Sequence, residues 1–63
     1  MVTEAEKQNA RDDGYEVYLT AFGTYDAYTV NRNGQRLEGR YGLESDAWDA
    51  AVAARWRDQN DRG

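Results

Sequence analysis

The sequence predicts an α+β fold with the order α-β-β-β-α, in which three antiparallel strands form a meander and the C-terminal helix packs on one face. Two observations predict it. Side chains alternate with a period of two between residues 15 and 41, and apolar side chains recur at helical spacing between residues 45 and 59. We expect residues 1–63 to form a single domain, because a chain this short buries only roughly 60% of its unfolded surface.

Residues 1–13 are expected to contain a short helix. Thr3 and Glu6 have the spacing of a capping box, and Gly14 can close the helix. Its candidate core residues are few and mostly small: Val2, Ala5 and Ala10. Because it lacks an apolar stripe, we expect loose attachment: the segment frays, is disordered, or becomes ordered on a partner.

The alternating region is predicted to form three strands joined by two-residue turns. The strands are expected at residues 15–22, 25–32 and 35–41. Gly23-Thr24 fits a type II′ turn, and Asn33-Gly34 fits a type I′ turn, which requires positive φ at both central residues.

These turns fix a strand register that can be checked against the apolar pattern. The predicted pairs across the two turns are Val17 with Val30, Leu19 with Tyr28, Arg32 with Gln35, Val30 with Leu37, Tyr28 with Gly39, and Asp26 with Tyr41. Both hairpins then place their aliphatic side chains on one predicted core face: Val17, Leu19, Tyr28, Val30, Leu37 and Tyr41.

Residues 45–59 are predicted to form the second helix. Ser45 is a suitable N-cap, and Trp48, Val52 and Trp56 recur as a stripe that faces the sheet. The exposed side of this helix is expected to carry Asp46, Asp49, Ala50, Ala53 and Arg57.

The composition argues against an enzyme. With no Cys and no His, the chain has no disulfide, no thiolate zinc site and no imidazole base. Glu44, Asp46 and Asp49 fit the charge preference of a helix N-terminus rather than the loop pattern of a metal site. A small sheet with one packed helix offers little concavity for paired carboxylates. We therefore expect no cofactor, no metal and no small-molecule substrate.

The location expected from the sequence is the cytoplasm, without a membrane partner. No apolar run approaches the roughly 18 residues of a membrane span, and the start Met1-Val2-Thr3-Glu4 lacks the basic and apolar regions of a signal peptide. The lack of Cys favours the same location.

The second face of the predicted sheet carries aromatic and arginine side chains: Tyr18, Phe22, Tyr25, Arg36 and Arg40. Exposed aromatic side chains require an explanation. The N-terminal helix or a second copy of the chain could cover them, they could form a hot spot for a protein partner, or they could stack the bases of a single-stranded nucleic acid. The net charge of -4 and the nearby acids Glu16, Asp26 and Glu38 disfavour nucleic acid.

The element order resembles, in outline, that of the double-stranded RNA-binding domain. That family places lysines at the start of its last helix to grip phosphates, whereas this chain has Glu44, Asp46 and Asp49 there. RNA binding by that route is not expected.

The chain is small and acidic, lacks Cys, and combines Asn33-Gly34 with a helix that carries Trp48 and Trp56. In this general character it resembles the small phage-encoded inhibitors called anti-CRISPR proteins, with which it shares no motif. The resemblance implies inhibition of a CRISPR effector by binding in the host cell cytoplasm, with carboxylates acting as a DNA mimic. The acids implied are Glu4, Glu6, Asp12, Asp13, Glu16, Glu44, Asp46 and Asp49.

The leading functional expectation is a non-enzymatic protein-binding inhibitor or adaptor directed at a basic nucleic-acid-handling complex. The uneven charge supports it, because residues 1–31 carry six acids against Lys7 and Arg11. The alternative is a small nucleic-acid-associated regulator that uses the aromatic and arginine face, as a monomer or homodimer. A third possibility is a structural module of a larger assembly.

Overall fold

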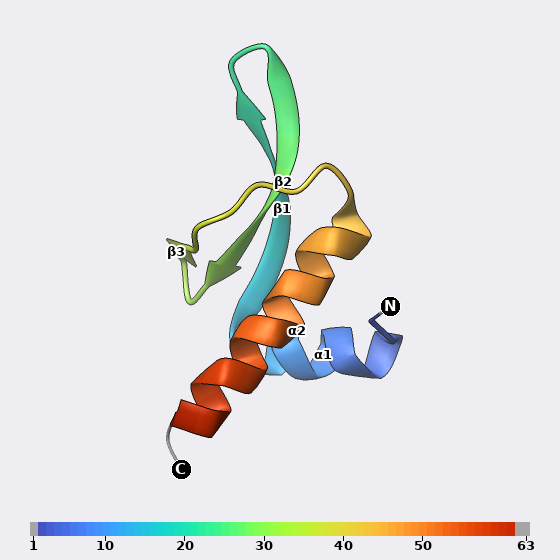
Figure 1. Ribbon diagram of the computed structural model, residues 1–63, viewed down its shortest axis with the longest axis vertical. Helices are drawn as coiled ribbons and strands as arrows, with labels where there is room; N and C mark the ends of the chain where they lie inside the picture. The colour runs from blue at the N-terminus through green and yellow to red at the C-terminus, as the bar shows by residue number, and fades with distance from the viewer. Residues whose placement is uncertain (1, 62–63) are drawn as a thin grey trace.

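The computed structural model describes residues 2–61, the last by its backbone alone; Met1, Arg62 and Gly63 of the expected 1–63 unit lie outside the described residues. The elements in order are helix α1 (Glu4–Asp12), strands β1 (Tyr15–Phe22), β2 (Tyr25–Arg32) and β3 (Gln35–Arg36), and helix α2 (Glu44–Asp61). The strands form one antiparallel sheet in the order β1-β2-β3, and α2 contacts β1 and β2 (Figure 1). The predicted α+β fold is confirmed.

Helix α1 begins with the predicted capping box. The Thr3 hydroxyl accepts from the Glu6 amide at 3.2 Å, and the Glu6 carboxylate accepts from the Thr3 amide at 3.2 Å. Ala10 is fully buried in the core and Val2 packs against it, whereas Ala5 is exposed and was wrongly expected at the core. The helix contacts both α2 and β1, and its fraying in solution stays a prediction.

The β1–β2 hairpin has the predicted register. Val17 pairs with Val30 and Leu19 pairs with Tyr28. Gly23 has a φ of 73°, and both Asn33 (52°) and Gly34 (84°) have positive φ, as the two predicted turns require.

The third strand was predicted too long. Strand β3 ends at Arg36 instead of Tyr41, although the Leu37 amide still donates to the Val30 carbonyl at 2.9 Å. The chain then loops out, and Tyr41 pairs with Tyr28, so the predicted pairs of Tyr28 with Gly39 and of Asp26 with Tyr41 are wrong. The reason is Gly39, whose φ of 115° lies outside the extended region and takes the backbone out of the ladder.

The core lies between the sheet and α2. Trp48 and Tyr15 are its largest fully buried side chains, and they pack with a set of small and β-branched residues: Ala10, Val30, Ala47, Ala51 and Val52. The aliphatic face of the hairpin and the tryptophan helix therefore face each other, as the register predicted.

Helix α2 departs from the prediction in three places. It begins at Glu44, so Ser45 is its second residue rather than its N-cap. Trp56 is 56% exposed, whereas Ala50, expected on the exposed side, packs against the core. At 3.6 residues per turn, Trp56 lies about 80° around the helix from Trp48, away from the buried Ala47 and Ala51. The repeat of i, i+4 and i+8 therefore drifts off the core face.

Two ion pairs tie α2 to the rest of the molecule. Arg55 pairs with Asp13, and the Arg32 guanidinium lies 3.0 Å from the Asp58 carboxylate. The hydrogen bond to Asp58, followed by the nearby Tyr15 phenol, raises the pKa of Arg32 above its ordinary value.

The turn end of the β1–β2 hairpin extends beyond both helices, as Figure 1 shows, and the molecule is 41 Å long. Leu19 lies in this half and is 60% exposed, so its predicted place in the core is wrong. Because α2 does not reach it, the core face of the strand is left uncovered there. Neither helix of the described residues is long and apolar enough to cross a membrane.

Candidate protein-interaction surfaces

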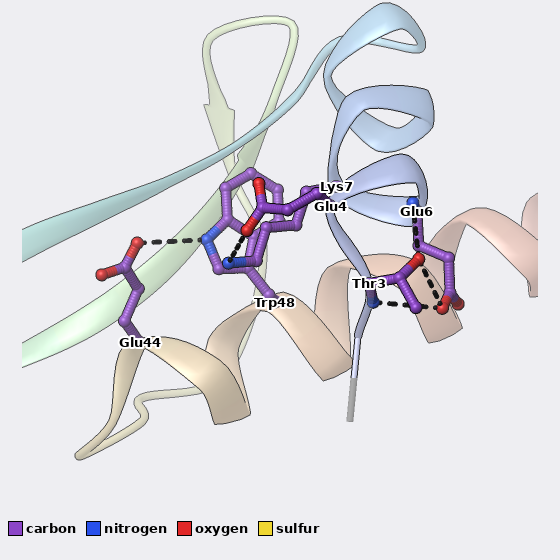
Figure 2. Close-up of polar contacts among 6 residues, drawn as sticks. All are labelled: Thr3, Glu4, Glu6, Lys7, Glu44 and Trp48. Atoms are coloured by element: carbon purple, nitrogen blue, oxygen red, sulfur yellow. Dashed lines mark hydrogen bonds and ion pairs between the residues drawn. The ribbon is translucent and has the colours of Figure 1, made fainter.

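The first candidate surface is built around the buried Trp48. Its indole Nε1 donates to the Glu44 carboxylate at 3.3 Å, and two cations of α1 lie over its ring. The Lys7 Nζ is 5.9 Å from the ring centroid and the Arg11 Cζ is 4.9 Å from it. Figure 2 shows the contact between Glu44 and the indole nitrogen of Trp48, and the Glu4–Lys7 pair drawn over the indole. Trp48 thus holds α1 to α2 by both burial and cation–π contact.

The acids that the sequence singled out lie on α1, at the start of β1 and on the first turns of α2. We call this set the acidic layer: Glu4, Glu6, Asp12, Asp13, Glu16, Glu44, Asp46 and Asp49. Contacts that converge on Trp48 connect three of them, because Lys7 pairs with Glu4 at 3.4 Å and Arg11 approaches Glu16 at 4.0 Å.

The other acids do not join that network. Glu6 is engaged in the capping box, Asp12 accepts from Gln8 at 3.0 Å, and Asp13 binds Arg55. Asp46 and Asp49 lie on the exposed side of α2, and their side chains form no hydrogen bond or ion pair within residues 2–61. The carboxylates are spread over a surface rather than gathered, and no group of three in the described chain could hold a metal ion.

The second candidate surface is the other face of the sheet, where four of the five predicted residues meet. The rings of Phe22 and Tyr25 stack with centroids 5.7 Å apart. The Arg40 guanidinium lies 4.1 Å from the Phe22 centroid and donates to the Tyr25 hydroxyl at 2.6 Å, and Arg36 lies 5.7 Å from the same ring. Tyr18, 54% exposed, stands apart from this cluster.

A cavity of about 340 Å³ opens beside the cluster. It is lined by Phe22, Thr29, Arg36, Leu37, Glu38, Gly39 and Arg40. Thr29 is 1% exposed, and it shares this lining with residues 36–40, which follow the β2–β3 turn. The signal that could have found this cavity is Gly39, since an isolated glycine inside a strand pattern indicates a bulge.

Within residues 2–61, three large apolar side chains are exposed outside these two surfaces. Leu19 is 60%, Leu43 62% and Trp56 56% exposed. The sequence assigned Leu19 and Trp56 to the core, and only tertiary structure reveals that neither is covered.

Comparisons of the chain with protein-family models, with curated proteins and with solved structures give no significant match. The function is therefore argued from the geometry of the two surfaces.

Proposed function

We propose that the chain is a non-enzymatic binding protein that occupies a basic surface of a nucleic-acid-handling complex and so inhibits it. The acidic layer is the contact surface. A CRISPR effector, with its positively charged nucleic-acid channel, is the kind of target that this surface fits.

The observation that carries the proposal is the difference in exposure between the acidic and basic side chains of two ion pairs. In the Glu4–Lys7 pair the carboxylate side chain is 88% exposed and the lysine 24%, and in the Asp13–Arg55 pair the values are 41% and 23%. Lys7 and Arg11 turn onto the ring of Trp48. Lys7 and Arg55 are thus drawn inward relative to their carboxylate partners, whereas Arg11 and Glu16 are equally exposed, at 44% each.

An outer layer of carboxylates has the charge that a nucleic-acid channel attracts. Opposite potentials steer two proteins together and raise the association rate, and the effect falls as salt screens the charges. The carboxylates of α1 and α2 are carried on two helices that pack together, and a backbone that is ordered before binding loses less entropy in the complex.

The test uses Asp46 and Asp49, whose neutralisation breaks no contact within residues 2–61. We expect the double variant Asp46→Asn/Asp49→Asn to associate about tenfold more slowly with a CRISPR effector complex at low salt, and to show a weaker salt dependence. Association rates are measured on immobilised effector complexes at several salt concentrations.

The matched control is Asp26→Asn/Glu38→Gln, which removes the same charge from exposed acids outside the acidic layer. It should keep nearly the full association rate. Equal loss in both double variants would mean that only net charge matters, and binding unaffected by Asp46→Asn/Asp49→Asn would contradict the proposal.

A second candidate function is supported by the arginines of the sheet face. Arg36 and Arg40 form no ion pair with a carboxylate in the described chain, although acids outnumber bases by 12 to 8. Two such cations beside an aromatic ring suit a phosphate and a stacked base. This candidate is weaker, because Arg40 already lies on the Phe22 ring, where a base would stack.

Binding of labelled single-stranded DNA and RNA at low salt tests this second candidate. Salt-sensitive binding that is lost in both Tyr18→Ala and Arg40→Ala would favour the nucleic-acid regulator and argue against the inhibitor. If the unmodified chain binds neither DNA nor RNA, the second candidate function is ruled out.

A further inference from the structure

We propose that strand β1 pairs with β1 of a second copy of the chain, so that two three-stranded sheets continue as one antiparallel sheet across a two-fold axis. The inference concerns the edge of β1, which shares only Glu16 with the acidic layer, and it does not depend on the proposed function.

Strand β1 is an edge strand, since the sheet order is β1-β2-β3. The direction of its outward backbone groups follows from the pairing. The Tyr28 amide donates to the Tyr41 carbonyl, on the side of β2 that faces away from β1. Tyr28 therefore forms no backbone hydrogen bond with its partner Leu19, and the Leu19 amide points away from β2. Val17 and Ala21 point the same way, because the orientation repeats every second residue.

This edge is uncovered over its second half. The turn end of the hairpin extends beyond both helices (Figure 1), and side chains on both of its faces are exposed: Tyr18 by 54% and Leu19 by 60%. A two-stranded hairpin is marginally stable in water, and an open edge is a template for another strand.

The edge also lacks the features by which proteins block such pairing. Residues 17–22 contain no charged residue, and the whole chain contains no proline. The opposite edge of the hairpin differs, because Asp26 places a charge on β2 and Arg40 crosses to Tyr25 there. Of the two hairpin edges, β1 is the one open to a partner.

A second copy fits this edge in one register. In this register Leu19 lies opposite Leu19 of the second copy, and Val17 lies opposite Ala21. The backbone amide and carbonyl groups of all these residues point away from β2, so they can form hydrogen bonds between the two copies. Tyr18 then lies opposite Thr20, a pairing of an aromatic with a β-branched side chain, which stabilises sheets. Glu16 lies opposite Phe22, so no two like charges face each other. The strand is therefore complementary to itself.

The test compares two leucines of similar exposure, Leu19 at 60% and Leu43 at 62%. Leu19→Lys places two cations opposite each other at the two-fold axis, and we expect its dimer dissociation constant to rise at least about tenfold. Leu43→Lys makes the same change at a residue outside the sheet that is 62% exposed, and its dimer should be as stable as that of the unmodified chain. Sedimentation equilibrium over a range of concentrations gives both constants.

Amide hydrogen exchange of the unmodified chain provides a second readout that requires no substitution. The amides of Val17, Leu19 and Ala21 should become more protected as concentration rises, whereas the amides of neighbouring Tyr18 and Thr20, which face β2, should change little. A chain that stays monomeric, a dimer unaffected by Leu19→Lys, or β1 protection that appears only with a different protein would overturn the inference.

The salt dependence separates this inference from the proposed function. Each copy carries a net charge of -4, so added salt reduces the repulsion between copies and strengthens the dimer. Added salt weakens the binding of the acidic layer to a basic partner. The two proposals therefore predict opposite salt effects, and either can be wrong while the other holds.

Discussion

The two tryptophans of α2 have different roles, although they lie on the same helix. Trp48 is 2% exposed, lies under Lys7 and Arg11 and donates to Glu44, whereas Trp56 is 56% exposed. The sequence predicted the first role but not the second, because a spacing of eight residues approximates a helical repeat without matching it. The contacts of Lys7 and Arg11 with Trp48 were also not predictable, since they depend on how α1 crosses α2.

Replacing each tryptophan by alanine tests this assignment. Trp48→Ala should cost about 3–5 kcal/mol, which is comparable to the about 3–9 kcal/mol expected for the whole of a 63-residue chain, and should leave it largely unfolded. Trp56→Ala should change stability by no more than about 0.5 kcal/mol. Urea unfolding followed by circular dichroism measures both. A large loss at Trp56 would show that it is covered in solution.

At the scale of elements, the turn residues predicted the two turns, whereas side-chain alternation did not predict the end of strand β3. Asn33-Gly34 and Gly23-Thr24 adopt the expected positive φ values because those conformations depend on the turn residues themselves. The end of β3 was missed because the alternation of residues 35–41 continues past Gly39, while the backbone does not. Side-chain alternation is therefore a weaker guide to a strand's end than a single glycine within it.

The loop after β3 gives a prediction at this scale. Gly39→Ala should destabilise the fold by at least about 1–2 kcal/mol, because an L-residue strongly disfavours a φ of 115°. A Cβ there would also lie 2.6 Å from the Tyr41 hydroxyl, whose ring would have to shift. Gly42→Ala is the control, since Gly42 has no positive φ and nothing within 4 Å of the added carbon. Thermal unfolding compares the two variants, and equal melting temperatures would show that the loop tolerates another conformation.

For the whole molecule, the sequence predicted the layering but not the shape. Register and helix pattern correctly placed the aliphatic hairpin face against Trp48. They could not predict that α2 leaves the turn end of the hairpin uncovered, because that depends on where the helix lies along the strands. The exposed Leu19 and the open β1 edge both follow from this offset.

The candidate site, like the fold, was predicted in part from the sequence. Its acids could be named from the sequence, and four of them lie in the first turn of a helix, where negative charge is favourable: Glu4, Glu6, Glu44 and Asp46. Their arrangement was not, because it depends on Lys7 and Arg11 lying over the Trp48 ring and on Arg55 pairing with Asp13. Exposed carboxylates are thus distributed over α1 and the start of α2, without forming one cluster.

A competition experiment tests most directly whether this carboxylate surface substitutes for nucleic acid. A CRISPR effector complex is saturated with the chain, and its duplex DNA target is then titrated in while both ligands are followed by separate fluorescent labels. The account predicts mutually exclusive binding, in which each DNA bound releases one molecule of the chain. A stable ternary complex that holds both ligands at full occupancy would contradict it.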